Sequence, residues 1–133
     1  MQKLIEAALN AREKSYSPYS NFKVGAALLT KDGEIYGGAN IENAAYGPSN
    51  CAERTAFFSA VFDGHRDFKA IAVCGGADEV TDYCYPCGVC RQVMREFCNP
   101  ETFKIYIVKS KDNYREYLLK DLLPLSFGPE DLV

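Results

Sequence analysis

Long apolar runs and clusters of basic residues are both missing from this sequence. No apolar run approaches the about 18 residues that a membrane-spanning helix needs, and the N-terminal stretch MQKLIEAALNAREKS is charged and helix-like rather than signal-like. No cluster of lysine and arginine is longer than two residues, and the formal net charge is −3. The sequence therefore predicts a cytoplasmic protein that has neither a membrane nor a nucleic acid as its partner.

Histidine is scarce as well, whereas cysteine is not. The single histidine, His65, lies in the polar turn 63–67 and is expected to be solvated. The chain has six cysteines, which in a reducing compartment indicate a metal site, catalysis or core packing rather than disulfides. Metal-binding and proton-transfer roles therefore fall to cysteine and glutamate.

The 133 residues, 47% of them hydrophobic, suffice for a single compact domain over 1–133, without linker or internal repeat. Helical periodicity predicts helices over 3–14, over 51–62 with Asn50 as N-cap, and over 86–97 with Pro86 as the first helical residue. Extended patterns predict a hairpin of 22–30 and 34–39 around Asp32-Gly33, strands over 68–74 (ended by Gly75-Gly76), 103–108 and 114–119, and a helical turn over 120–124. This alternation predicts an α/β fold with helices covering a mixed sheet.

Three cysteines lie at the starts of two predicted helices. Cys87 and Cys90, three residues apart, project from the same face of the first helical turn and can chelate one ion. Cys51, at the start of another helix, could complete a three-thiolate set if both helices point at the same spot. Helix N-termini favour the thiolate form that zinc requires. Three protein ligands leave zinc with one open position, which is typical of a catalytic site.

Two charged residues follow Cys51 directly. Glu53 is too close to Cys51 to be a comfortable second ligand, but it is well placed to reach water at the open position and to act as general base. Three thiolates weaken zinc as a Lewis acid, so an adjacent positive donor would help. Arg54 and Arg91 are the candidates, and Arg54 is favoured because it belongs to the same short segment as Cys51 and Glu53.

Other interpretations of the cysteines remain open. Taken singly, each is most simply a buried apolar thiol. Cys84 extends the spacing to C-x-x-C-x-x-C, so a structural zinc with Cys84 as fourth ligand is an alternative. A dithiol redox site at Cys87 and Cys90 is another, although it would come late in the chain for that class. Cys74 and Cys98 are expected to be core or surface thiols.

The motifs CAERTA (51–56), PCGVCRQV (86–93) and NIENAAYG (40–47) resemble those of the small cytidine deaminases of pyrimidine salvage. The similarity extends to SPYSNFKVGAAL (17–28) and LLPLSF (122–127), and so spans nearly the whole chain. A lone C-x-x-C is a weak signal, whereas C-A-E together with P-C-x-x-C at this separation is specific. The resemblance implies a three-layer α/β/α sandwich with a mixed five-stranded sheet.

It also implies a reaction, the zinc-dependent hydrolysis of cytidine or deoxycytidine to uridine or deoxyuridine with release of ammonia. Cys51, Cys87 and Cys90 would bind one Zn²⁺ per chain, and Glu53 would move the protons. The resemblance further implies a homotetramer with shared active sites. The substrate-binding residues that the resemblance implies are Asn40 and Glu42 at the ribose hydroxyls, the Ala52 N–H at the pyrimidine edge, Phe22 beside the base, Tyr46, and Phe127 from a neighbouring subunit.

Without the resemblance, simpler explanations exist for several of these residues. Glu42 would be a free surface carboxylate, Phe22 a core residue at the start of a strand, and Asn40 a strand-ending turn residue. The nearest rival function is deamination of another cytosine nucleoside such as blasticidin S, and a rival of another class is a non-catalytic zinc-binding module. The amides and the acid of the loop 40–43 suit a ribose with free hydroxyls.

Overall fold

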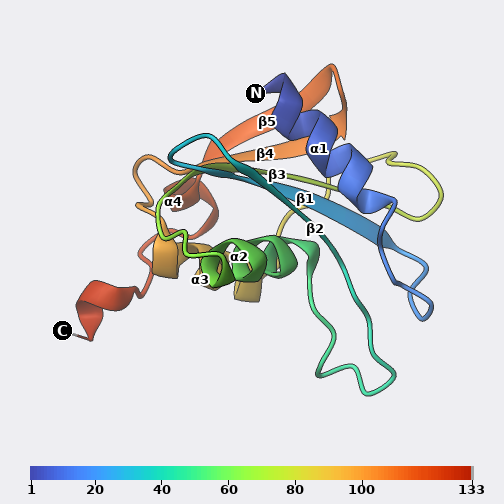
Figure 1. Ribbon diagram of the computed structural model, residues 1–133, viewed down its shortest axis with the longest axis horizontal. Coiled ribbons are helices and arrows are strands. Elements are labelled where there is room, and N and C mark those ends of the chain that lie inside the picture. The colour runs from blue at the N-terminus through green and yellow to red at the C-terminus, as the bar shows by residue number, and fades with distance from the viewer. Residues whose placement is uncertain (133) are drawn as a thin grey trace.

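The computed structural model describes residues 1–132 and contains one five-stranded sheet with helices on both faces (Figure 1). The strands are β1 (Lys23–Thr30), β2 (Ile35–Ala39), β3 (Phe68–Gly76), β4 (Lys104–Ser110) and β5 (Asn113–Leu118). The helices are α1 (Gln2–Arg12), α2 (Ala52–Phe62), α3 (Gly88–Phe97) and α4 (Leu119–Leu122), followed by a 3₁₀ turn, η1 (Pro129–Asp131). Within these residues, no helix has the length and apolar character needed to cross a membrane.

The sheet is mixed, as expected, with the strand order β2-β1-β3-β4-β5. Only β3 and β4 run parallel, with Ile71 opposite Ile105, and the other neighbours are antiparallel. A parallel pair needs a crossover connection, and α3 lies within the one between β3 and β4. The predicted hairpin, the fifth strand and the helical turn after it are all present.

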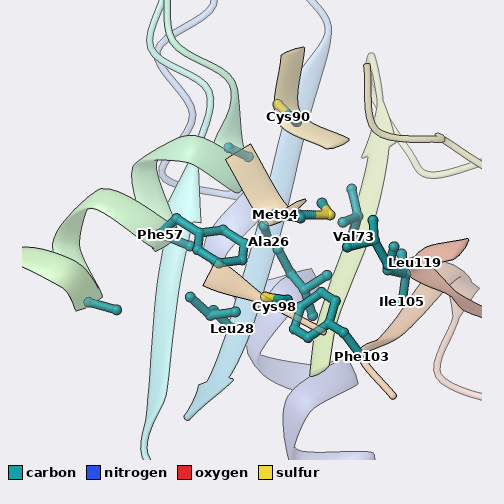
Figure 2. Packing of buried hydrophobic residues seen from close by; sticks show 14 of the residues in the cluster. Ala26, Leu28, Phe57, Val73, Cys90, Met94, Cys98, Phe103, Ile105 and Leu119 are labelled. Carbon is teal, nitrogen blue, oxygen red and sulfur yellow. The ribbon is translucent and has the colours of Figure 1, made fainter. Parts of the chain in front are cut away.

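Helices cover the two faces of the sheet, which confirms the three-layer arrangement. On one face, Leu4, Ile5 and Ala8 of α1 pack against residues of β1, β3 and β4. On the other, Phe57 of α2 and Met94 of α3 join the larger core cluster (Figure 2). In that view Cys90 and Met94, four residues apart in α3, both lie on the core side, and Cys98 follows just after the helix ends. Cys90 therefore lies where the core reaches the start of α3.

Both functional helices begin later than their sequence predicts. Cys51, not Asn50, is the N-cap of α2, because Asn50 is held in an extended bridge with Ile41 by two backbone hydrogen bonds of 2.8 and 2.9 Å. Cys87, not a residue before Pro86, is the N-cap of α3, and its backbone is extended (φ −69°, ψ 166°). Pro86 is therefore outside the helix. Two of the three clustered cysteines are thus N-caps.

Strand β3 continues through Gly75 and Gly76 instead of ending before them, because both glycines pair with the start of β1. The glycines mark close packing, not a strand end. A Cβ at Gly75 would lie 2.8 Å from the sulfur of Cys84 and 2.9 Å from the ring of Phe22. Helix α1 ends at Arg12 rather than at residue 14, and a turn with a Lys14 N–H to Ala11 C=O hydrogen bond follows it.

Candidate active site

The starts of α2 and α3 bring three sulfur atoms together. The sulfur of Cys87 lies 3.9 Å from that of Cys51 and 3.6 Å from that of Cys90, and all three lie within 4.8 Å of one another. A tetrahedral zinc with Zn–S bonds of about 2.3 Å holds its sulfurs about 3.8 Å apart. The spacing of the three thiols therefore fits one zinc ion bound by Cys51, Cys87 and Cys90.

Arg54 lies against this group of sulfurs. Its Nη2 donates a hydrogen bond of 3.1 Å to the Cys51 sulfur. A hydrogen bond from Cys90 and then that from Arg54 lower the pKa of the Cys51 thiol to about 5, against the opposing effect of partial burial. Arg91 instead donates to the backbone carbonyls of Pro86 and Leu122, at 2.7 and 2.6 Å. Of the two arginines, Arg54 is therefore the one that supplies positive charge to the thiolates.

Glu53 is the second residue of α2 and only 4% exposed. Burial raises the pKa of its carboxyl to about 7, and the negative charge of Cys51 adds to the effect, while a backbone hydrogen bond and Arg54 oppose it. A carboxyl that titrates near neutral pH can both accept and donate a proton under working conditions. Its position beside the sulfurs suits that task.

The other cysteines lie apart from the group. Cys84 is not among the clustered sulfurs and lies against Gly75 instead, and burial raises the pKa of its thiol to about 11. Cys74 is buried and donates to the Ala8 carbonyl at 3.4 Å, and Cys98 belongs to the core. This arrangement does not support Cys84 as a fourth ligand.

Asn40 directly follows β2, and its side chain makes three hydrogen bonds to its own chain. Its Oδ1 accepts hydrogen bonds from the Val24 N–H at 2.9 Å and the Ser15 hydroxyl at 2.5 Å, and its Nδ2 donates to the Phe22 carbonyl at 2.8 Å. One N–H of the amide remains for a ligand. Asn40 thus fixes the start of β1 and the position of Phe22, whatever else it binds.

Glu42 has a comparable set of partners at the surface. Its carboxylate accepts hydrogen bonds from the backbone N–H groups of Tyr19 and Ser20, at 3.0 and 3.1 Å, and from the Ser20 hydroxyl. These bonds, above all that of the hydroxyl, hold the pKa of Glu42 below its ordinary value. The antiparallel Ile41–Asn50 bridge closes the loop that carries Glu42. Glu42 and Tyr46 line an open pocket of about 340 Å³.

Comparison with known proteins agrees with this geometry. Residues 1–106 match the family model of the cytidine and deoxycytidylate deaminase zinc-binding region. The chain belongs to the cytidine deaminase family. It is 52% identical over 132 residues to a cytidine deaminase of Sporosarcina psychrophila (99% of this chain, 94% of the relative) and 50% identical over 131 residues to one of Halalkalibacterium halodurans (98% and 96%). The crystal structure of cytidine deaminase from Burkholderia pseudomallei superposes with a TM-score of 0.85 at 52% identity, covering 94% of this chain and 97% of that one.

The remaining residues expected at a cytidine deaminase site range from fully buried to largely exposed. Ala52 is fully buried as the first residue of α2, where a backbone N–H has no partner within the helix. Phe22 is 41% exposed, Tyr46 is 75% exposed with a φ of 46°, and Phe127 is 56% exposed on the tail that follows α4. The structure brings the three cysteines, Glu53 and Arg54 into one group, while these aromatic rings are open to solvent.

Sequence reasoning missed the polar residues that hold several of the predicted site residues in place. Ser15 and Ser20 bind the side chains of Asn40 and Glu42, and they lie in the segment around the resembling motif 17–28. Gln92 and Arg95 of α3 hold the tail. The signal for these two was their i, i+3 spacing on the polar side of an amphipathic helix, which by itself indicates only a solvated face.

Proposed function

We propose that this chain catalyses the zinc-dependent hydrolysis of cytidine and deoxycytidine to uridine and deoxyuridine, with release of ammonia, as a step of pyrimidine salvage. The observation that carries the proposal is the convergence of three sulfurs within 4.8 Å beside a buried glutamate. Three ligands leave a tetrahedral ion one open position, which a purely structural site would close. The names of the relatives agree with this assignment.

Cys51, Cys87 and Cys90 would hold one zinc ion as thiolates. When bound, the zinc supplies a Lewis acid that makes water a nucleophile near neutral pH. Arg54 helps to keep the Cys51 sulfur deprotonated and offsets part of the negative charge of the three thiolates. The positive N-terminal ends of α2 and α3 act in the same direction.

Glu53 moves the protons. It takes one from the attacking water and passes it to ring nitrogen 3, while oxygen bonds to carbon 4. It then takes the second proton from the new hydroxyl on carbon 4 and gives it to the amino group, whose bond to carbon 4 breaks as ammonia leaves and the carbonyl forms. The raised pKa of Glu53, about 7, suits a group that must be base and acid within one cycle.

Recognition of the nucleoside falls to the surroundings of this centre. Glu42 and the free N–H of Asn40 bind the ribose hydroxyls, and the ionised state of Glu42 suits an acceptor of hydroxyl hydrogens. The Ala52 N–H contacts the pyrimidine edge, with Phe22 and Tyr46 beside the substrate. The preference for free hydroxyls favours cytidine over a nucleoside of the blasticidin S type.

We further propose a homotetramer with shared sites, working in the cytoplasm. Helix α2 is apolar on the side away from the core as well, with Phe58 and Phe62 49% and 93% exposed, and the tail exposes Leu125 and Phe127. Exposed apolar groups of this size are typical of protein interfaces. Phe127 would reach the pocket of a neighbour. The six cysteines are all free in the structure, which suits a reducing compartment.

The decisive experiment follows the absorbance of cytidine in the presence of protein whose zinc content has been measured. Deamination changes the pyrimidine chromophore, so we expect the spectrum of uridine to replace that of cytidine. The Glu53→Ala protein serves as the control. Zinc-loaded protein that leaves cytidine unchanged would favour the non-catalytic zinc module, and turnover of blasticidin S in preference to cytidine would favour the rival deaminase.

A further inference from the structure

Helix α3 holds the C-terminal tail with two side chains, Gln92 near its middle and Arg95 near its end. Gln92 Nε2 donates a hydrogen bond of 2.8 Å to the backbone carbonyl of Phe127. Arg95 Nε donates one of 2.8 Å to the Ser126 hydroxyl, on the residue before Phe127. The two residues are three apart on one side of the helix, so both can bind the same stretch of the tail.

Arg95 contacts the tail on both sides of Phe127. Its guanidinium forms an ion pair with Glu130 of η1. It also packs so closely against Gly128 that a Cβ there would overlap it. The Arg95 side chain is only 11% exposed, although its partner Glu130 is at the surface. A largely buried arginine with three tail partners holds the tail more firmly than a single ion pair between exposed side chains would.

Apolar packing does not hold this stretch of tail in its own subunit. Leu125 and Leu132, on either side, are both almost fully exposed, and Phe127 itself is half exposed. The tail leaves the layered part of the molecule beyond α4 and ends away from the sheet (Figure 1). The place of the Phe127 ring is therefore set by the polar contacts from α3.

We propose that Arg95, assisted by Gln92, is a positioning residue that sets the Phe127 ring for the pyrimidine pocket of the neighbouring subunit. This rests on the proposed function, in which Phe127 acts in trans. Helix α3 then serves two sites. Its start provides Cys87 and Cys90 to the site of its own subunit, and Gln92 and Arg95 further along position an aromatic ring for another. Substitution of Arg95 should accordingly lower catalytic efficiency in the same way as removal of the Phe127 ring, but by a smaller factor.

The first test is kinetic and uses the whole zinc-loaded enzyme. Arg95→Met keeps the stem of the side chain and removes its hydrogen bonds, so catalytic efficiency should fall roughly 3- to 30-fold, as expected for one or two lost hydrogen bonds. Zinc content should stay unchanged. Arg95→Lys should restore part of the loss through Glu130, and Glu96→Gln, on the next residue of α3, is the matched control and should change nothing.

The double variant Arg95→Met with Phe127→Ala separates positioning from general damage. If Arg95 acts through Phe127, the double variant should be no worse than Phe127→Ala alone. If the fold-losses of the two single variants multiply in the double variant, Arg95 does not act through Phe127, and the inference is overturned.

The second test does not depend on activity. The chain has no tryptophan, so Phe127→Trp places a single indole reporter on the tail. With Arg95 intact we expect high fluorescence anisotropy, and with Arg95→Met a lower anisotropy and faster quenching by acrylamide. Unchanged anisotropy and quenching would overturn the positioning role.

Mixing of subunits then tests the trans role separately. Glu53→Ala chains carry an intact tail, and Arg95→Met chains carry an intact Glu53. Hybrid tetramers should regain activity per intact Glu53 if the ring acts in trans. A reporter that responds to Arg95→Met without any gain on mixing would support Arg95 as the positioning residue and contradict the trans part of the proposed function.

Discussion

The reactive centre and the recognition residues of this chain differ in how much of their surroundings the chain itself supplies. Cys90 and Glu53 are buried at helix starts packed on the sheet, and Arg54 completes a group with contacts of 3 to 4 Å. Tyr46 and Phe127 lie on a loop and a tail and are more than half exposed. One folded chain thus assembles the groups for the chemistry, whereas it leaves these two aromatic rings exposed, which agrees with the proposal that neighbouring subunits complete the enclosure of the substrate.

The largest expected effect comes from removing a sulfur of the reactive centre. Cys87→Ser should lose zinc and turnover together, because two remaining thiolates cannot hold the ion as three do. Cys87 is exposed, so the substitution should leave the core intact. Metal analysis and the cytidine assay on the same sample measure both losses. Cys84→Ser is the matched control, and loss of zinc in that variant would show that the ligand set is wrong.

Removal of the proton-transfer group should separate chemistry from metal binding. Glu53→Ala should keep about one zinc per chain, and turnover should fall by the upper end of the about 10²–10⁴-fold that a general acid–base group contributes, or by more, since Glu53 acts in several steps. Glu53→Gln, which preserves volume at this buried position, should behave alike. Activity above a tenth of the original in either variant would exclude the role.

An intermediate effect is expected when the exposed ring of Phe127 is removed. Phe127→Ala should lower catalytic efficiency roughly 5- to 150-fold, since stacking of an aromatic ring on a base contributes about 1–3 kcal/mol. Zinc content should not change. Mixed oligomers of Phe127→Ala and Glu53→Ala chains should be more active than either parent. No gain, with reassembly verified by size, would place the ring in its own subunit or outside the site.

The smallest expected effect is that of substituting Asn40. This residue is an expected ribose ligand, like the recognition residues, but its side chain is held by its own chain, like the reactive centre. Its side chain makes three hydrogen bonds, so Asn40→Ala should lower the free energy of unfolding by about 1–3 kcal/mol, at about 1 kcal/mol each. Urea titration at fixed protein and zinc concentration measures this. Asn43→Ala, in the same loop with one bond to the Ala45 N–H, is the control. Equal losses in both variants would contradict the organising role of Asn40.

Most elements were predictable from local patterns, and the errors have physical causes. The hairpin around Asp32-Gly33, the three long helices and the parallel-strand segments follow from periodicity and turn chemistry. The start of α2 was misplaced because Asn50 is a good N-cap by type, but its backbone pairs with Ile41 from the other end of the loop. The sequence misplaces the end of β3 because Gly75-Gly76 has the composition of a turn, whereas both glycines pair with β1 and Gly75 leaves room for Cys84 and Phe22.

The sequence by itself determined that Cys87 and Cys90, three residues apart, lie at one helix start and that Glu53 follows Cys51 by two residues at another, because these separations are local and do not depend on the rest of the fold. Only the tertiary structure decided that the two helix starts meet, that Arg54 rather than Arg91 faces the sulfurs, and that Arg95 holds the tail beside Phe127. These facts join residues that are distant in the chain. They depend on α2 and α3 covering the same face of a sheet ordered β2-β1-β3-β4-β5, and no local pattern encodes that packing.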